Sequence, residues 1–389
     1  MATEAPRALY LHVPFCSRRC PYCDFAIRVG GDRLQEAYVQ ALGRELARLG
    51  EASGVATSLQ SLYLGGGTPS LLRLDLLERL LGEVARHFRL AAAAEVTLEA
   101  NPADVNRARA RQWRSLGVNR LSLGVQSLDD RVLGWLGRNH DAAAAHRAIT
   151  AARRAGFDNL SCDLIYAVPV QPTAVFVRGL ETLLRHRPEH VSCYELTVEA
   201  GTPLARRIAA RRAPAPSEDD FLEQHRLARQ RLLAAGLEHY EVSNYALPGH
   251  RSRHHLAYWR GEHYLAAGAG AHGFLGPELG ARLGMEPAPS AGGVRYWNRR
   301  STDAYLRQVS RLGHGRAGWE SVGPGQLELE RLSCGLRLRE GVSLGAPARS
   351  GRARELAELG LLELEGDRVR ATPRGVEVLD RLSLELASA

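Results

Sequence analysis

The stretch Tyr10–Phe25 reads YLHVPFCSRRCPYCDF, and its first residues belong to a short apolar run, residues 9–13, that predicts a strand just before the cysteines. Its three cysteines have a C-x3-C-x2-C spacing: Cys16, Cys20 and Cys23. Pro21 lacks a backbone N–H and disfavours a helix here, so we expect the thiolates on a loop. Three closely spaced thiolates suit an iron–sulfur cluster, whereas a closed zinc site needs four ligands, commonly as paired C-x2-C units. The spacing predicts a [4Fe-4S] cluster with one iron open to a small molecule.

The composition of the chain is that of an ordinary globular protein. Its 389 residues are 45% hydrophobic and 24% charged, enough for one large domain and a smaller one. The net charge of +8 would favour propionates, an anionic membrane surface or nucleic acid. Dispersed, solvated arginines explain the same charge. Peripheral membrane association therefore stays open, and the charge alone selects no partner.

The cysteines outside the loop, Cys162, Cys193 and Cys334, lie far apart in the sequence. Such a pattern predicts buried, reduced thiols rather than a disulfide framework. We find no signal-peptide pattern and no run of about eighteen apolar residues. These features predict a cytoplasmic protein.

Apolar strand-like segments alternate with longer helical patterns from the cysteine loop onward. The strands are expected at 9–13, 62–64, 95–99, 121–124, 160–165 and 191–196. Six such units predict an α/β fold in which right-handed crossovers curl parallel strands into a partial (βα)6 TIM-like barrel. In barrels of this kind the chemistry lies at the carboxyl ends of the strands.

The repeating pattern fades after about residue 205, and we expect three regions. They are a barrel over 1–240, a segment rich in histidine and aromatic residues over 241–298, and a C-terminal domain over 299–389. The Gly- and Pro-rich run 275–298 suggests an insertion or boundary. In the last region, helices precede a predicted hairpin, 361–364 with 369–371, which favours a winged-helix-like α+β domain.

DNA binding is the obvious function to test for such a domain. Phosphates would have to dock near acidic side chains: Glu355, Glu358, Glu363 and Glu365. Because these carboxylates would repel the phosphates of DNA, we expect no nucleic-acid partner. We interpret the domain as one that packs on the barrel or covers the substrate.

A glycine run, Gly65-Gly66-Gly67-Thr68-Pro69, follows the second predicted strand. Glycines let a backbone approach a ligand and present its N–H and C=O groups, although many such runs are only turns. Glu99, Gln126 and Asp163 also fall at or just past strand ends. These residues and the cysteine loop therefore converge on one rim of the predicted barrel.

With Tyr22 before its last cysteine, the loop resembles that of the radical S-adenosylmethionine (SAM) superfamily. The sequences HVPFC and CDF look like its coproporphyrinogen dehydrogenase/HemW branch. The resemblance implies a radical-SAM barrel and reductive cleavage of SAM by one electron from the cluster. Position by position, it implies SAM contacts from Tyr10, Tyr22, Gly66, Gly67, Thr68, Glu99, Gln126, Arg138 and Asp163. These types suit SAM, because its ammonium and ribose need acceptors and its carboxylate needs a donor such as arginine.

Six of the 14 histidines fall within residues 239–272, interleaved with aromatic residues. Histidine is a common haem ligand and aromatic side chains suit a flat porphyrin. The run 253–259, RHHLAYW, resembles the HNxxYW motif of HemW-type haem chaperones, with histidine where asparagine is usual. The candidate haem-binding residues are His254, His255, Tyr258 and Trp259. The alternative is that these histidines cap turns and pack beneath the open edge of the barrel.

Two functions follow from the resemblance. Dehydrogenases of this branch carry a further cysteine two residues after the third, where this chain has Phe25. That favours a HemW-type haem chaperone that holds a [4Fe-4S] cluster and SAM, binds haem and passes it to an acceptor protein. The alternative is an oxygen-independent coproporphyrinogen III dehydrogenase, which would abstract hydrogen from propionates before decarboxylation. The missing cysteine and the lead of only 15 residues before Cys16 count against it.

A third reading is a winged-helix regulator with a cluster sensor, which would require salt-dependent DNA binding. If SAM is cleaved, an electron donor such as a flavodoxin or ferredoxin would be a further partner. The sequence assigns no catalytic residue.

Overall fold

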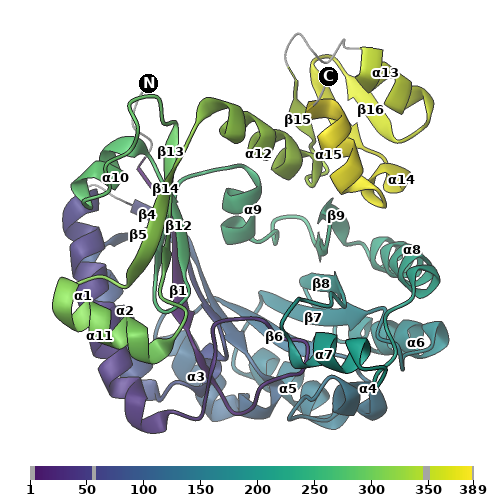
Figure 1. Ribbon diagram of the computed structural model, residues 1–389. Coiled ribbons are helices and arrows are strands. Elements are labelled where there is room, and N and C mark those ends of the chain that lie inside the picture. Colours follow the sequence, from purple (N-terminus) through teal and green to yellow (C-terminus); the bar gives the residue numbers. More distant parts are fainter. Residues whose placement is uncertain (1–4, 55–57, 345–350, 388–389) are drawn as a thin grey trace.

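The computed structural model describes residues 5–54, 58–344 and 351–387. Within these ranges six parallel strands lie side by side at the centre of the largest sheet (Figure 1). They are β1 (Ala8–Val13), β4 (Ser58–Gly66), β5 (Arg89–Ala100), β6 (Arg120–Gln126), β7 (Leu160–Tyr166) and β8 (His190–Glu195). Each pairs with the next in sequence order, so the predicted radical-SAM (βα)6 arrangement is confirmed.

Helices between these strands cover the outer face of the curved sheet (Figure 1). They are α1 (Gln35–Ser53), α2 (Leu74–His87), α3 (Arg107–Ser115), α4 (Asp130–Trp135), α5 (Ala142–Arg154) and α6 (Thr173–Leu184). In β1, Leu9 and Leu11 are fully buried in the core that the helices share. Alternation along a strand turns Tyr10 and His12 to the opposite face, inside the barrel. None of the described helices is long and apolar enough to cross a membrane.

Further strands extend the sheet at both edges. Next to β1 lie β11 (Tyr264–Ala267), β12 (His272–Leu275), β13 (Gly293–Asn298) and β14 (Arg316–Val322); next to β8 lie β10 (Asn244–Ala246) and β9 (Glu238–Glu241). The run 275–298, expected as an insertion or boundary, instead contributes α10 (Pro277–Arg282) and β13. One of its glycines, Gly293, has a packing role, because a Cβ there would lie 2.5 Å from the ring of Phe274.

The chain after β14 forms a separate small core. Four helices, α12 (Pro324–Leu336), α13 (Gly351–Glu358), α14 (Pro373–Val376) and α15 (Leu379–Ala387), pack with strands β15 (Val342–Ser343), β16 (Leu362–Glu365) and β17 (Arg368–Ala371). Leu336, Leu356 and Val369 are among its buried residues. The winged-helix-like arrangement is therefore confirmed. The large sheet, however, continues past residue 298 through β14, and this small core begins with α12.

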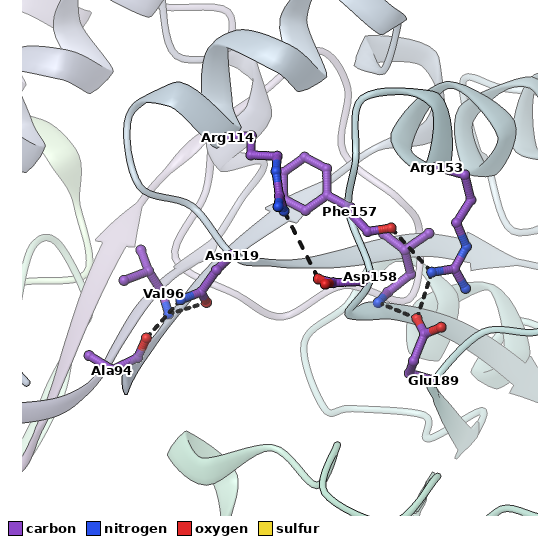
Figure 2. Close-up of polar contacts among 9 residues, drawn as sticks. Ala94, Val96, Arg114, Asn119, Arg153, Phe157, Asp158 and Glu189 are labelled. Carbon is purple, nitrogen blue, oxygen red and sulfur yellow. Dashed lines mark hydrogen bonds and ion pairs between the residues drawn. The ribbon is translucent and has the colours of Figure 1, made fainter. Parts of the chain in front are cut away.

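The amino ends of the parallel strands are tied together by polar contacts (Figure 2). The Asn119 side chain accepts from the Val96 N–H at 2.8 Å and donates to the Ala94 carbonyl at 2.7 Å. Arg153 pairs with Glu189 at 2.8 Å. The amino end of such a barrel commonly serves stability, and the carboxyl end carries the site.

All six cysteines are free thiols. Cys162 in β7 and Cys193 in β8 are buried, as predicted, whereas Cys334 in α12 is only half-buried.

Candidate functional site

A cavity of about 400 Å³ opens at the carboxyl ends of the parallel strands. The structure brings all three motif cysteines and eight of the nine predicted SAM residues to its wall. These are Cys16, Cys20, Cys23, Tyr22, Gly66, Gly67, Thr68, Glu99, Gln126, Arg138 and Asp163. Segments more than a hundred residues apart meet here because parallel strands deliver their carboxyl ends to one edge.

The cysteine loop is held by a short parallel pair, β2 (Phe15–Cys16) and β3 (Arg28–Val29). The Cys23 N–H donates to the Cys20 carbonyl at 3.2 Å, which closes a backbone turn between these two cysteines. In the described part of the chain, no three His, Cys, Asp or Glu side chains are gathered for a single metal ion. A cluster differs from a single ion in spreading its thiolate ligands over several irons, so this loop has the donor set for a cluster.

Positive charge and burial surround these sulfurs. A guanidinium nitrogen of Arg138 lies 3.6 Å from the Cys20 sulfur, where it would balance thiolate charge. Burial raises the pKa of the Cys16 thiol to about 11, against a hydrogen bond from Thr68. Bound iron would reverse that effect, because metals bind the thiolate.

Only glycine fits at two positions of the run after β4. Gly66 has φ +119, and a Cβ there would lie 2.6 Å from the ring of His12. A Cβ on Gly67 would lie 2.6 Å from the Pro14 carbonyl oxygen. The absence of side chains brings this backbone to the cavity wall, where it can meet a ligand.

Two carboxyl groups face the cavity from β5 and β7. Glu99 accepts hydrogen bonds from the Tyr63 hydroxyl at 2.8 Å and the Gly66 N–H at 3.1 Å. Burial raises its pKa from 4.5 to about 7, and Asp163 adds to the shift. Asp163 accepts from Ser122 at 3.2 Å, and burial likewise raises its pKa. Such carboxyl groups suit the hydroxyl and ammonium donors of a small ligand.

Two polar side chains at the cavity each have a buried polar atom without a hydrogen-bond partner among the described residues. The buried Gln126 Oε1 and Arg138 Nε have no hydrogen-bond partner within the described ranges. Gln126 also has φ +62, a strained conformation for a residue with a side chain. Buried polar atoms are normally paired, so these are available for a ligand such as SAM. The wall residues thus fit SAM.

Tyr10 is the one predicted SAM residue outside the cavity wall. Its hydroxyl is 3.0 Å from His12 Nδ1, and its ring stacks on Tyr63 with centroids 6.1 Å apart. Tyr10 therefore supports Tyr63, which does line the cavity.

The RHHLAYW run forms a short helix, α9 (Arg253–Trp259), against β4 and β5. Glu95 accepts the N–H groups of Arg253 at 3.2 Å and His254 at 3.3 Å. The buried His254 ring uses both nitrogens, with Ser61 Oγ at 2.9 Å and the Tyr258 hydroxyl at 2.7 Å. In this conformation His254 has no nitrogen free for iron.

Of the four candidate haem residues, only His255 lines the cavity. Trp259 packs instead beside a small buried cluster that includes Tyr240 and Leu338. Burial lowers the pKa of His255 to about 3, and the charge of Arg120 adds to the shift. Its imidazole is therefore neutral at pH 7, the form that binds metals.

Sequence reasoning missed Arg120, which lies fully buried in β6. Its three guanidinium nitrogens have no hydrogen-bond partner among the described residues. The signal was a charged residue two positions before Ser122, on the same inward face of a strand. The sequence analysis also missed Tyr63 and Tyr194, which line the cavity.

Comparison with known proteins agrees with this geometry. Residues 10–178 match the model of the radical SAM superfamily. The chain is 38% identical over 376 residues to the haem chaperone HemW of Mycobacterium tuberculosis, covering 95% of this chain and 92% of that protein. It is 36% identical over 400 residues to the mitochondrial radical S-adenosyl methionine domain-containing protein 1 of Bos taurus, covering 98% and 87%.

Among solved structures, the coproporphyrinogen III oxidase HemN of Escherichia coli has a TM-score of 0.82, covering 100% of this chain and 92% of that one. At 20% identity, this likeness concerns the fold. The chain therefore belongs to the radical SAM superfamily and, within it, to the HemW family.

Proposed function

We propose that this protein is a haem chaperone that carries a [4Fe-4S] cluster and SAM, binds haem and passes it to an acceptor protein. The observation that carries the proposal is the similarity over nearly the whole chain to a protein named a haem chaperone. Phe25 supports it, because the dehydrogenase resemblance would require a cysteine at that position.

The cavity residues divide between the two cofactors. Cys16, Cys20 and Cys23 would hold the cluster, and when bound, cluster and SAM supply one-electron chemistry. Arg138 would donate to the carboxylate of SAM. In support, one guanidinium nitrogen donates to the Gly124 carbonyl at 3.1 Å, while its Nε has no partner among the described residues. Glu99 and Asp163 would accept hydrogen bonds from ribose or ammonium groups, and the Gly66-Gly67 backbone would lie against the ligand.

We assign the haem contact among the RHHLAYW residues to His255. Its neutral imidazole faces the cavity, whereas His254 is bonded at both nitrogens. Helix α9 would then fix His255 beneath the cavity, with His254 and Tyr258 as supports and Trp259 in the packing behind them.

The remaining partners belong to the same proposal. A flavodoxin or ferredoxin would supply electrons if SAM is cleaved, and the net charge of +8 would support peripheral contact with an anionic membrane. We place the protein in the cytoplasm, since its six cysteines form no disulfide, which suits a reducing compartment.

One divided experiment tests the proposal. The cluster is reconstituted anaerobically and the sample is split. One half is titrated with haem while the Soret band is followed, and is then mixed with an apo-haemoprotein. The other half receives SAM, reductant and coproporphyrinogen III. We expect stoichiometric haem binding and transfer without formation of protoporphyrinogen IX. Turnover without stable haem binding would contradict the proposal and identify a decarboxylating dehydrogenase.

A further inference from the structure

Two aromatic side chains stand exposed at the mouth of the cavity. Phe25 is 60% exposed and Tyr194 is 37% exposed, whereas most large apolar side chains of the barrel are buried. Both line the cavity, together with Ile27, Ile165 and Leu196. An apolar surface gathered around a cavity, rather than scattered singly, commonly marks a binding site.

The loop that carries Phe25 is firmly held, so this exposure is a fixed feature. The Arg28 N–H donates to the Pro14 carbonyl at 2.7 Å, and the Gly30 N–H donates to the Cys16 carbonyl at 2.9 Å. The guanidinium of Arg300 donates to the Asp24 carbonyl, next to Phe25. Tyr194 comes from the end of β8, on a different segment of the chain. Two separately anchored segments thus present aromatic side chains to the same opening.

The cysteine loop that carries Phe25 also carries two cations, Arg18 and Arg19. Arg18 lines the cavity and is exposed; its guanidinium donates to the Arg138 carbonyl at 3.1 Å. Neither Arg18 nor the exposed Arg19 forms an ion pair in the described part of the chain. Carboxylates, those of Glu195 and Glu199, line the mouth on the segment that carries Tyr194. The mouth is therefore apolar, with the positive charges of Arg18 and Arg19 on the cysteine loop, where the carboxylate of Asp24 is paired with Arg300 at 4.0 Å. Negative charge comes from Glu195 at the end of β8 and from Glu199 beyond it.

We propose that this mouth is the docking surface for the porphyrin of haem. The ring face would rest on Phe25 and Tyr194, and the two propionates would point to Arg18 and Arg19, away from Glu195 and Glu199. A flat aromatic macrocycle with two anionic groups on one edge matches this distribution of apolar surface and charge. The inference rests on the proposed haem function and adds the residues that give it specificity. It also gives Phe25 a role: an apolar contact where the dehydrogenases have a cysteine.

The test compares rim variants with matched controls in haem titrations of the reconstituted full-length protein. Phe25→Ala and Tyr194→Ala should each weaken haem binding at least tenfold. Leu384→Ala, which removes an equally exposed apolar side chain (64%) from α15, should leave the Kd within twofold. The double variant Arg18→Glu/Arg19→Glu should weaken binding at least tenfold, and its control, Arg107→Glu/Arg111→Glu on α3, should not.

Iron-free porphyrin distinguishes the proposed contacts at the mouth of the cavity from the proposed contact of His255 with the iron. Protoporphyrin IX, followed by fluorescence quenching, should respond to the rim variants as haem does but should not respond to His255→Ala. Its dimethyl ester lacks the propionate charges, so its Kd should be the same for the Arg18→Glu/Arg19→Glu variant and the wild type. Iron, sulfide and SAM binding are measured for every variant. If Phe25→Ala loses its cluster, Tyr194→Ala carries the test.

The outcomes are distinct. Failure of the wild type to bind haem would overturn the proposed function. If the wild type binds haem, but Phe25→Ala and Tyr194→Ala weaken that binding no more than Leu384→Ala does, only the proposed contacts of Phe25 and Tyr194 would be overturned. If the Arg18→Glu/Arg19→Glu variant loses as much affinity for the dimethyl ester as for protoporphyrin IX, the proposed propionate contacts would be overturned.

Discussion

The barrel interior contains two polar regions, the cavity at the carboxyl ends of the strands and helix α9 beneath it, and they differ in how their polar atoms are paired. In the cavity, Gln126 Oε1 and Arg138 Nε are buried without partners among the described residues. In α9, both nitrogens of His254 are bonded within the protein. Both regions carry motifs that suggest ligands, yet His254 is bonded entirely within the protein. The cavity, which His255 of α9 also lines, leaves donors and acceptors for a ligand. A motif residue is therefore better judged by its unpaired atoms than by its type.

The largest expected effect concerns the cysteine loop. Replacing Cys16, Cys20 and Cys23 together with alanine should abolish bound iron and sulfide, because their thiolates are the ligands that would hold the cluster. Iron and sulfide analysis after reconstitution measures this. The control is Cys162→Ala, whose thiol is buried in the barrel wall away from the loop. Full iron content in the triple variant would remove the cluster assignment.

Next comes the glycine run. Gly67→Val should weaken SAM binding about a thousandfold, roughly 4 kcal/mol, because the new Cβ would meet the Pro14 carbonyl, which is backbone and cannot rotate away. Calorimetric titration with SAM is the measurement. Gly82→Ala in α2, where a Cβ would meet nothing within 4 Å, is the control and should bind SAM normally. Wild-type SAM affinity in the Gly67 variant would show that the run is only a turn.

Glu99 makes the stability of the ligand-free protein depend on pH. Its pKa is about 7 in the folded state against 4.5 ordinarily, so the folded state holds the proton more tightly than the unfolded chain does. Well below pH 4.5, Glu99 therefore does not lower the free energy of unfolding. As pH rises it lowers this free energy increasingly, by up to about 3 kcal/mol above pH 7.

Glu99→Gln removes that titration. The unfolding free energy of the variant minus that of the wild type should increase from pH 4 to pH 8, toward the same 3 kcal/mol. Denaturant unfolding at several pH values measures it. A difference that stays constant with pH would show that Glu99 titrates normally.

Much of the fold could be predicted from the sequence because its signals are local. The six parallel strands and their helices follow from apolar segments that alternate with helical patterns, and the cysteine loop from spacing alone. The edge strands β10 to β14 could not be predicted. Strands β10, β11 and β12 have only three or four residues, and β13 begins at Gly293, whose role in packing only the folded chain reveals. The different environments of His254 and His255 also depend on how α9 packs, which neighbouring positions in a sequence do not show.

The contrast between His254 and His255 tests the account most directly. Unfolding free energy and haem affinity are measured for His254→Ala and His255→Ala. We predict that His254→Ala loses about 2 kcal/mol of stability, because Ser61 and Tyr258 lose their partner, while haem affinity and Soret position stay close to those of the wild type. His255→Ala should keep its stability within about 0.5 kcal/mol and shift the Soret band with weaker haem binding. Loss of haem binding in His254→Ala, with a normal spectrum in His255→Ala, would contradict the account and identify His254 as the haem ligand.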